Sequence, residues 1–239
     1  MNNPITGRAG IGTSRTTSPR KIVLADPQYL PGGLVIDGSK SRDLGNTGDT
    51  DVLRAGLAMG KITASGKYAP AVIGTLVYPH AADGSGNLLL TVTAAVAAEI
   101  VRRIGTSGTL TLTGPPSAAG TVAQAEYTFS AVNTTTGVIT ISDGSVSFIA
   151  GSFVSASDGS ANPLFLVGED NHGGTKVTDQ DDANIDVDWA TPISGGRIDA
   201  SQIINYPSDA SLVTWVKSKL NRGDGTFEGA APFSFDDND

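Results

Sequence analysis

The sequence contains no cysteine, which excludes a disulfide framework and a thiol nucleophile. A chain without cysteine suits a protein that matures in a reducing cytoplasm. The longest run rich in apolar residues, 88–101, is too short and too interrupted by threonine to span a bilayer. The first residues also lack the apolar segment of a signal peptide. We therefore expect a soluble protein that has no membrane partner.

Aromatic and charged residues are also scarce, at 6% and 17% of the chain. Aromatic residues this few and scattered do not form a platform for stacking bases or sugars. A surface with few charges is expected where neighbouring subunits cover much of it, although a β-protein rich in serine and threonine would look similar. The net charge of −8 argues against nucleic acid as a general partner.

Glycine, serine, threonine, alanine and valine are abundant instead, with 30 glycines in the chain. This composition favours many short strands and turns over a helical bundle. The tripeptide Asp-Gly-Ser occurs four times, beginning at Asp37, Asp83, Asp143 and Asp158. Because Asp-Gly is a strong signal for a turn between strands, the repeats indicate a β-rich fold.

The stretch 51–74 predicts a β-hairpin. Residues 57–62 alternate between the two faces of a strand, and Gly66 can take the positive φ that a tight turn requires. Residues 67–70 then form an extended return that ends at Pro70. Other segments with alternating apolar residues predict strands at 22–24, 34–36, 73–78, 109–113, 127–130, 138–141, 148–154, 164–167 and 185–189. Asp26-Pro27 and Pro79 are expected to end the strands that they follow.

Two segments show helical periodicity. In residues 93–104, apolar residues recur every four positions, Thr93 is suited to cap the amino terminus and Gly105 the carboxyl terminus. In residues 208–223, an apolar stripe follows Ser208, which we expect to be the N-cap. The sequence therefore predicts a mainly β protein with two short helices.

The two ends of the chain carry opposite charge. All charged residues among the first 21 are basic, namely Arg8, Arg15, Arg20 and Lys21. This segment shows no periodicity, so it is either a flexible tail or an arm that becomes ordered on a partner surface. From residue 224 onward all charged residues are acidic, and Phe227, Phe233 and Phe235 lie among them. Aromatic residues in a loop-like tail indicate docking onto this subunit or onto a neighbour.

No pattern of catalytic residues stands out. Residues 60–68 lack the spacing of a phosphate-binding loop, and Tyr68 replaces the serine or threonine that binds magnesium there. The two histidines, His80 and His172, lie in turn-like polar segments without the partners of a triad or a zinc site. We therefore expect no catalytic residues, no cofactor and no enzyme activity.

An oxygen-rich segment at residues 179–186 is a candidate for a metal site. Its polar residues are Asp179, Asp181, Asp182, Asn184 and Asp186, and such side chains supply the oxygen ligands of Ca²⁺. The spacing lacks the glycine and the final glutamate of an EF-hand loop. A solvated acidic turn is the alternative, and it is the interpretation that we favour.

Two parts of the sequence resemble a known family. Residues 52–57 (VLRAGL), 60–63 (GKIT) and 65–68 (SGKY) of the predicted hairpin resemble the head decoration proteins of tailed bacteriophages, the lambda-type capsid cement proteins. The stretch from Lys176 onward, which includes residues 198–220 (IDASQIINYPSDASLVTWVKSKL), is similar to the longer members of that group. The resemblance implies a small β-barrel or β-tulip-like core. It also implies homotrimers on the outer surface of the phage head that bind the major capsid protein, made and assembled in the host cytoplasm.

The resemblance further implies a division of the chain. Residues 1–50 would form an extended arm with short strands, and residues 51–86 and 168–239 the decoration-like core. Residues 87–167 would form an inserted β-rich module, because the smallest members lack this stretch. The residues expected to contact the capsid or neighbouring subunits are Arg8, Arg15, Arg20, Lys21, Phe227, Phe233 and Phe235.

A module displayed on the virion that binds carbohydrate or a host surface is the alternative function. The alternating threonine- and serine-rich strands between residues 109 and 141 fit this alternative equally well. A receptor module is expected to bind glycans or cells in isolation, whereas a cement protein is expected to bind expanded capsids. Because of the family resemblance, we expect the structural role of a decoration protein.

Overall fold

The computed structural model describes residues 22–29, 34–82, 88–115, 121–142, 148–168, 174–189, 192–221 and 233–236. Over these residues the protein is mainly β, with two α-helices, α1 (Ala94–Arg103) and α2 (Ala210–Leu220). Two short 3₁₀ turns, η1 (Gly38–Lys40) and η2 (Ala200–Gln202), are also present. The predicted fold class, a mainly β protein with two short helices, is confirmed. No helix in the described ranges is long and apolar enough to cross a membrane.

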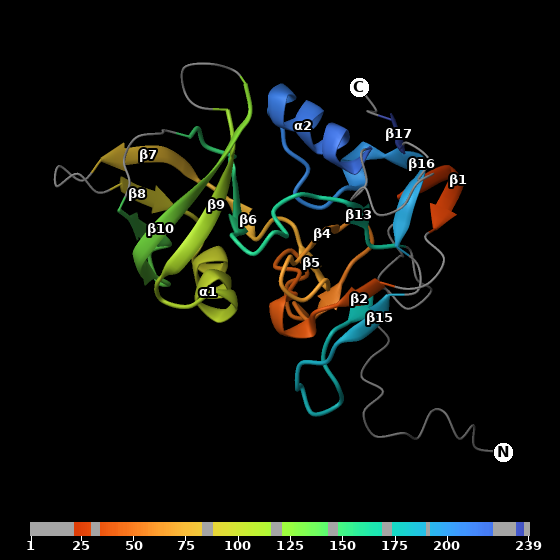
Figure 1. Ribbon diagram of the computed structural model, residues 1–239, viewed down its shortest axis with the longest axis horizontal. Coiled ribbons are helices and arrows are strands. Elements are labelled where there is room, and N and C mark those ends of the chain that lie inside the picture. The colour runs from red at the N-terminus through yellow and green to blue at the C-terminus, as the bar shows by residue number, and fades with distance from the viewer. Residues whose placement is uncertain are drawn as a thin grey trace.

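The first sheet has the strand order β1-β16-β13-β4-β5-β2-β15, with β17 also paired to β16 (Figure 1). Its strands are β1 (Val23–Tyr29), β2 (Leu34–Ile36), β4 (Ala58–Lys61), β5 (Tyr68–Pro70), β13 (Phe165–Leu166), β15 (Val187–Trp189), β16 (Ile193–Asp199) and β17 (Phe233–Asp236). β16 pairs antiparallel with β1 and parallel with β17. Strands from both ends of the described chain therefore lie in one sheet. β3 (Val52–Leu53) and β14 (Thr175–Lys176) form a separate antiparallel pair.

The second sheet has the order β6-β12-β9-β10-β11-β8-β7. Its strands are β6 (Gly74–Thr75), β7 (Tyr78–Ala82), β8 (Leu88–Thr91), β9 (Gly108–Gly114), β10 (Ala123–Asn133), β11 (Val138–Ile141) and β12 (Phe153–Ala156). In Figure 1 it lies beside the first sheet, with α1 packed below it. The strand predicted at 148–154 begins only at Phe153, because a turn with Gly151 at φ +84° precedes it.

The sheets divide the chain near residues 74 and 156. The module expected at residues 87–167 overlaps most of the second sheet, but that sheet also includes β6 and β7, which precede residue 87. β13 lies before residue 167 and pairs with β4 in the first sheet. Residues 74–156 therefore contribute all the strands of the second sheet.

The hairpin predicted at residues 51–74 is confirmed as the antiparallel pair of β4 and β5. Its turn is closed by the Ile62 amide, which donates to the Lys67 carbonyl at 2.8 Å. Gly66 takes φ +71°, a conformation that costs glycine nothing because it has no Cβ. The residues of the turn thus determine the register of this hairpin, as the sequence indicates.

Both predicted helices are present, and one cap differs from the prediction. The Thr93 hydroxyl accepts from the Val96 amide at 3.3 Å, so Thr93 caps α1 as predicted. α2 is capped by Asp209 instead of Ser208, because the Asp209 carboxylate accepts from two amides of the first turn at 2.9 and 3.0 Å. An ionised acceptor at a helix amino terminus also interacts favourably with the helix dipole.

Two prolines expected to end strands lie inside strands instead. β1 continues through Asp26-Pro27 to Tyr29, with Asp26 at φ +51° and three register shifts against β16. Residues 73–78 are divided between β6 and β7, and Pro79 lies within β7. β1 and β7 are the end strands of their sheets, and a proline on an end strand need not interrupt a ladder of hydrogen bonds. Their bulges and prolines also make them poor templates for pairing with another strand.

Apolar side chains join the two sheets beneath α2. Phe153 of β12 belongs to a buried cluster with Leu212, Val216 and Leu220 of α2. The Phe153 ring lies 6.4 Å from the Trp215 ring, centre to centre. α2, which lies in the chain between β16 and β17 of the first sheet, is therefore packed against a strand of the second.

A buried arginine forms a second junction between the sheets. The Arg103 guanidinium, from the end of α1, donates to the Pro70 carbonyl at 2.9 Å and to the Ser160 hydroxyl at 2.6 Å. It also pairs with Asp158 at 3.2 Å, and its side chain is 1% exposed. Burial raises the pKa of Asp158, but the positive charge of Arg103 and the hydrogen bonds from Ser160 outweigh it, so the net pKa lies below 3.8.

Candidate functional site

Most residues expected to contact a partner lie outside the described part of the chain. These are Arg8, Arg15, Arg20, Lys21 and Phe227. His172 also lies outside it, and His80 lies in β7. Phe233 and Phe235 are described, and both belong to β17.

β17 packs against its own chain. Phe233 is 4% exposed and joins the buried cluster beneath α2, and its amide donates to the Asn221 side chain at 2.6 Å. Phe235 is partly buried, with its ring centre 5.9 Å from that of Phe233 and 5.4 Å from the Lys217 ammonium. The sequence left two docking targets open for the tail, this subunit or a neighbouring one. The described part of the tail, β17, contacts this subunit.

The described ends of the chain meet at one residue of β16. The Asp199 amide donates to the Ile22 carbonyl at 2.9 Å, and Asp199 also pairs with Asp236 of β17. β1 and β17 thus flank β16 at the same end, and two strand spacings amount to about 10 Å. The first and the last described residues, Ile22 and Asp236, therefore lie close together at this end of β16. Arg197 and Asp236 form an ion pair at 2.5 Å beside this point.

β1 is exposed along almost its entire length. Val23 is buried, and all six following residues are exposed, so both faces of the strand are uncovered. Leu24 is 40% exposed and Tyr29 is 45% exposed. Large apolar side chains on an uncovered strand next to a charged terminal segment form a candidate contact surface, which we call the β1 surface (residues 24–29).

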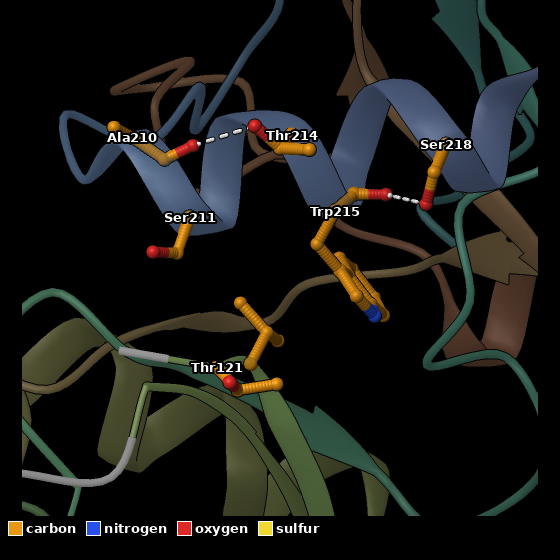
Figure 2. Close-up of a pocket in the computed structure, with 7 residues that line it drawn as sticks. Thr121, Ala210, Ser211, Thr214, Trp215 and Ser218 are labelled. Carbon is orange, nitrogen blue, oxygen red and sulfur yellow. Dashed lines mark hydrogen bonds between the residues drawn. The ribbon is translucent and has the colours of Figure 1, made fainter. Parts of the chain in front are cut away.

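A groove runs between α2 and the residues that precede β10 (Figure 2). It has a volume of about 560 Å³ and is lined by Thr121, Val122, Ala210, Ser211, Thr214, Trp215 and Ser218. Figure 2 shows the Trp215 indole and the Ser211 hydroxyl extending from α2 toward the opposite wall. The Thr214 hydroxyl donates to the Ala210 carbonyl at 2.9 Å, and the Ser218 hydroxyl to the Trp215 carbonyl at 2.8 Å. We call this feature the α2 groove.

A second, polar pocket of about 510 Å³ lies beside β3 and β14. Its charged residues are Arg42, Asp49, Asp51, Lys176 and Asp182. Burial lowers the pKa of Arg42, and a hydrogen bond from Thr178 lowers the pKa of Asp51. Arg42 already donates to the carbonyls of Gly38 and Ser41. Two cations and three carboxylates line the pocket, so it carries both signs and favours no ligand of one sign.

The side-chain oxygens of the acidic segment 179–186 form hydrogen bonds and ion pairs with different partners. Asp179 accepts from the amides of Asp181 and Ala183, both at 2.9 Å. Asp186 forms an ion pair with Lys67 at 2.6 Å, and this bond raises the pKa of Lys67. Asn184 accepts from Arg42. Within the described ranges, no three or more His, Cys, Asp or Glu side chains are placed to hold a metal ion.

Sequence reasoning missed the α2 groove. The small residues on one face of the predicted second helix were a local signal for it, since a helix face that lacks bulky side chains leaves room beside it. The opposite wall, Thr121 and Val122, is about ninety residues away in the sequence and gave no such signal.

No model of a known protein family matches the chain, and neither does any curated protein or solved structure.

Proposed function

We propose that the protein is a structural decoration (cement) protein that binds the outer surface of a phage head and stabilises the lattice of the major capsid protein. The resemblance of residues 52–68 and 198–220 to lambda-type decoration proteins supports this role. The partners are the major capsid protein and further copies of this chain in a homotrimer, with no nucleic acid and no membrane. The site of action is the outside of the virion.

The exposed strand β1 is the observation that carries the proposal. A strand with both faces uncovered and with Leu24 and Tyr29 exposed gains apolar burial when a neighbouring subunit covers it. The basic segment 1–21 precedes it directly and supplies charge for an acidic capsid surface or for the acidic tail of an adjacent copy. Because β1 is bulged and contains Pro27, the contact is made through side chains and not through strand addition.

Symmetry makes modest contacts sufficient for this role. Each copy in a closed oligomer repeats the same contacts with the capsid. Once one copy is bound, the others are held near their own sites at a high effective concentration. A trimer that spans neighbouring capsid subunits therefore needs no large single interface. The lattice is held by the sum of many equivalent contacts.

The test is co-sedimentation with empty expanded capsids of the parent phage, after sedimentation equilibrium of the protein alone. We expect saturable binding, and we expect deletion of residues 1–21 or Tyr29→Ser to weaken it at least tenfold. Tyr78→Ser is the matched control, because Tyr78 is 63% exposed but lies on β7 of the other sheet. Unchanged binding by both the deletion and Tyr29→Ser would refute the role of the β1 surface. Absence of binding by the intact protein would refute the decoration function itself.

A further inference from the structure

We propose that the α2 groove binds a neutral oligosaccharide. Its volume of about 560 Å³ lies within the usual range of small-ligand sites. None of its described lining residues carries a charge. A charge does lie nearby, the Lys219 ammonium, 5.5 Å from the centre of the Trp215 indole. A ligand with several charges would lose its hydration here for at most this one cation, and a neutral ligand avoids that cost.

The hydrogen-bonding groups of the groove match a ligand rich in hydroxyls. Because the Thr214 and Ser218 hydroxyls already donate their protons to backbone carbonyls, their oxygens remain available as acceptors. The Trp215 indole N–H is a donor only, and the Ser211 hydroxyl both donates and accepts. A sugar presents hydroxyl groups that donate and accept in turn, so it can satisfy all four residues.

The same groups make an extended peptide a poorer occupant. A peptide that docks as a strand needs unpaired backbone donors and acceptors along an exposed edge. The α2 wall offers side-chain hydroxyls instead, because the backbone groups of a helix interior are paired with one another. The chemistry of the wall therefore favours hydroxyl groups over a peptide backbone.

The apolar part of the groove is fixed in advance. Trp215 lies against Phe153, and the Lys219 ammonium is 5.5 Å from the indole centre. Val122 on the opposite wall is partly buried against the same apolar cluster. Held between these neighbours, the indole loses little freedom when a ligand arrives, which lowers the entropic cost of binding. The C–H groups of a sugar ring then pack against Trp215 and Val122.

Binding can be followed by tryptophan fluorescence in a Trp189→Phe background, which leaves Trp215 as the sole indole of the chain. The probes are maltohexaose, cellohexaose and laminarihexaose. Hexagalacturonate serves as a charged comparator and a Ser/Thr-rich hexapeptide as a peptide comparator.

Two variants, Ser211→Leu and Ser218→Leu, each place a larger side chain in the groove from the α2 side. Ala98→Leu on α1 is the matched control, since it places the same side chain on an exposed helix position. Circular dichroism and the melting temperature establish that each variant is folded.

The expected result is saturable binding of at least one neutral hexasaccharide with a change in Trp215 fluorescence. A folded Ser211→Leu or Ser218→Leu variant should lose at least tenfold in affinity, and Ala98→Leu should bind as before. The proposal is overturned if no neutral probe binds, if the peptide or the charged sugar binds better, or if the filled groove binds equally well. Saccharide binding does not depend on the decoration role, because capsid co-sedimentation measures that role separately.

Discussion

The Asp199 amide donates to the Ile22 carbonyl at 2.9 Å, and this bond holds the first described residue of the chain against β16. Ile22 is fully buried, and Val23 is 8% exposed. On the other side of β16, Asp236 lies beside the same Asp199. The buried side chains that anchor β1 are thus two, whereas the side chains from Leu24 to Tyr29 are exposed although the backbone pairs with β16 as far as Tyr29.

This anchor predicts a sharp difference between two changes at the amino terminus. Deleting residues 1–21 should leave the free energy of unfolding within about 0.5 kcal/mol of the intact protein, because Ile22 keeps its contacts. Ile22→Ala should lower it by about 2–5 kcal/mol, because the side chain is buried in the cluster beneath α2. Urea denaturation of both proteins measures the difference. A large loss of stability in the deletion variant would mean that segment 1–21 is itself part of the folded core.

The buried Arg103 predicts a strong effect at the junction of the sheets. Arg103→Met should destabilise the protein by about 3–5 kcal/mol, because the Pro70 carbonyl, Ser160 and Asp158 all lose their donor. Lys176→Met is the control, since Lys176 is exposed and its ion pairs are long, at 3.7 and 3.8 Å. That change should cost less than about 1 kcal/mol. Urea denaturation measures the free energy of unfolding of both variants. Equal losses would show that the Arg103 contacts contribute little to that free energy.

The pKa of Asp158 predicts a specific loss of stability in acid. Its folded-state pKa lies below 3.8, mainly through the charge of Arg103 opposing the effect of burial, so the unfolded chain takes up the proton first as the pH falls. The stabilisation is therefore present above pH 3.8 and is lost as the pH falls through the lower folded-state pKa. Between pH 5 and pH 2.5, the urea midpoint of Asp158→Asn should fall less than that of the unchanged protein. Asp181→Asn, on an exposed loop, controls for the change in net charge, and a parallel fall in all three proteins would refute the linkage.

Features determined by neighbouring residues were predictable from the sequence, and those that depend on distant contacts were not. Thr93 and Gly66 act within one turn of chain, so the cap of α1 and the turn of the β4–β5 hairpin followed from the sequence. Pro27 and Pro79 were misread because their effect depends on whether a strand lies at the end of a sheet. For β1 that position depends on pairing with β16, which lies far along the chain. β7 pairs with the next strand, β8, and it is an end strand because the other strands of its sheet are arranged beyond β8.

The candidate surfaces show the same limit. The opposite charges of the two termini were evident from the sequence, but the proximity of Ile22 and Asp236 at Asp199 requires the parallel pairing of β16 with β17. The α2 groove likewise needs the packing of Phe153 against Trp215 before its two walls face each other. Periodicity gives the face of a helix, and tertiary packing decides what that face meets.

The contact between Val96 of α1 and Gly74 of β6 gives a test of this packing. A Cβ on Gly74 would lie 2.3 Å from Val96 Cγ2, so Gly74→Ala should cost about 1–3 kcal/mol through overpacking. Val96→Ala removes the two Cγ atoms, at 2.3 and 2.8 Å, and leaves only the Cβ of residue 96 at 3.1 Å. In that background the same change should cost less than about 1 kcal/mol, measured as coupling in a double-mutant cycle. Gly60→Ala is the matched control, because its Cβ would lie 1.9 Å from the backbone carbonyl oxygen of Ser160, which Val96→Ala does not move. If Val96→Ala relieved both glycine variants equally, the effect would be a general loosening of the core and not the contact between Gly74 and Val96.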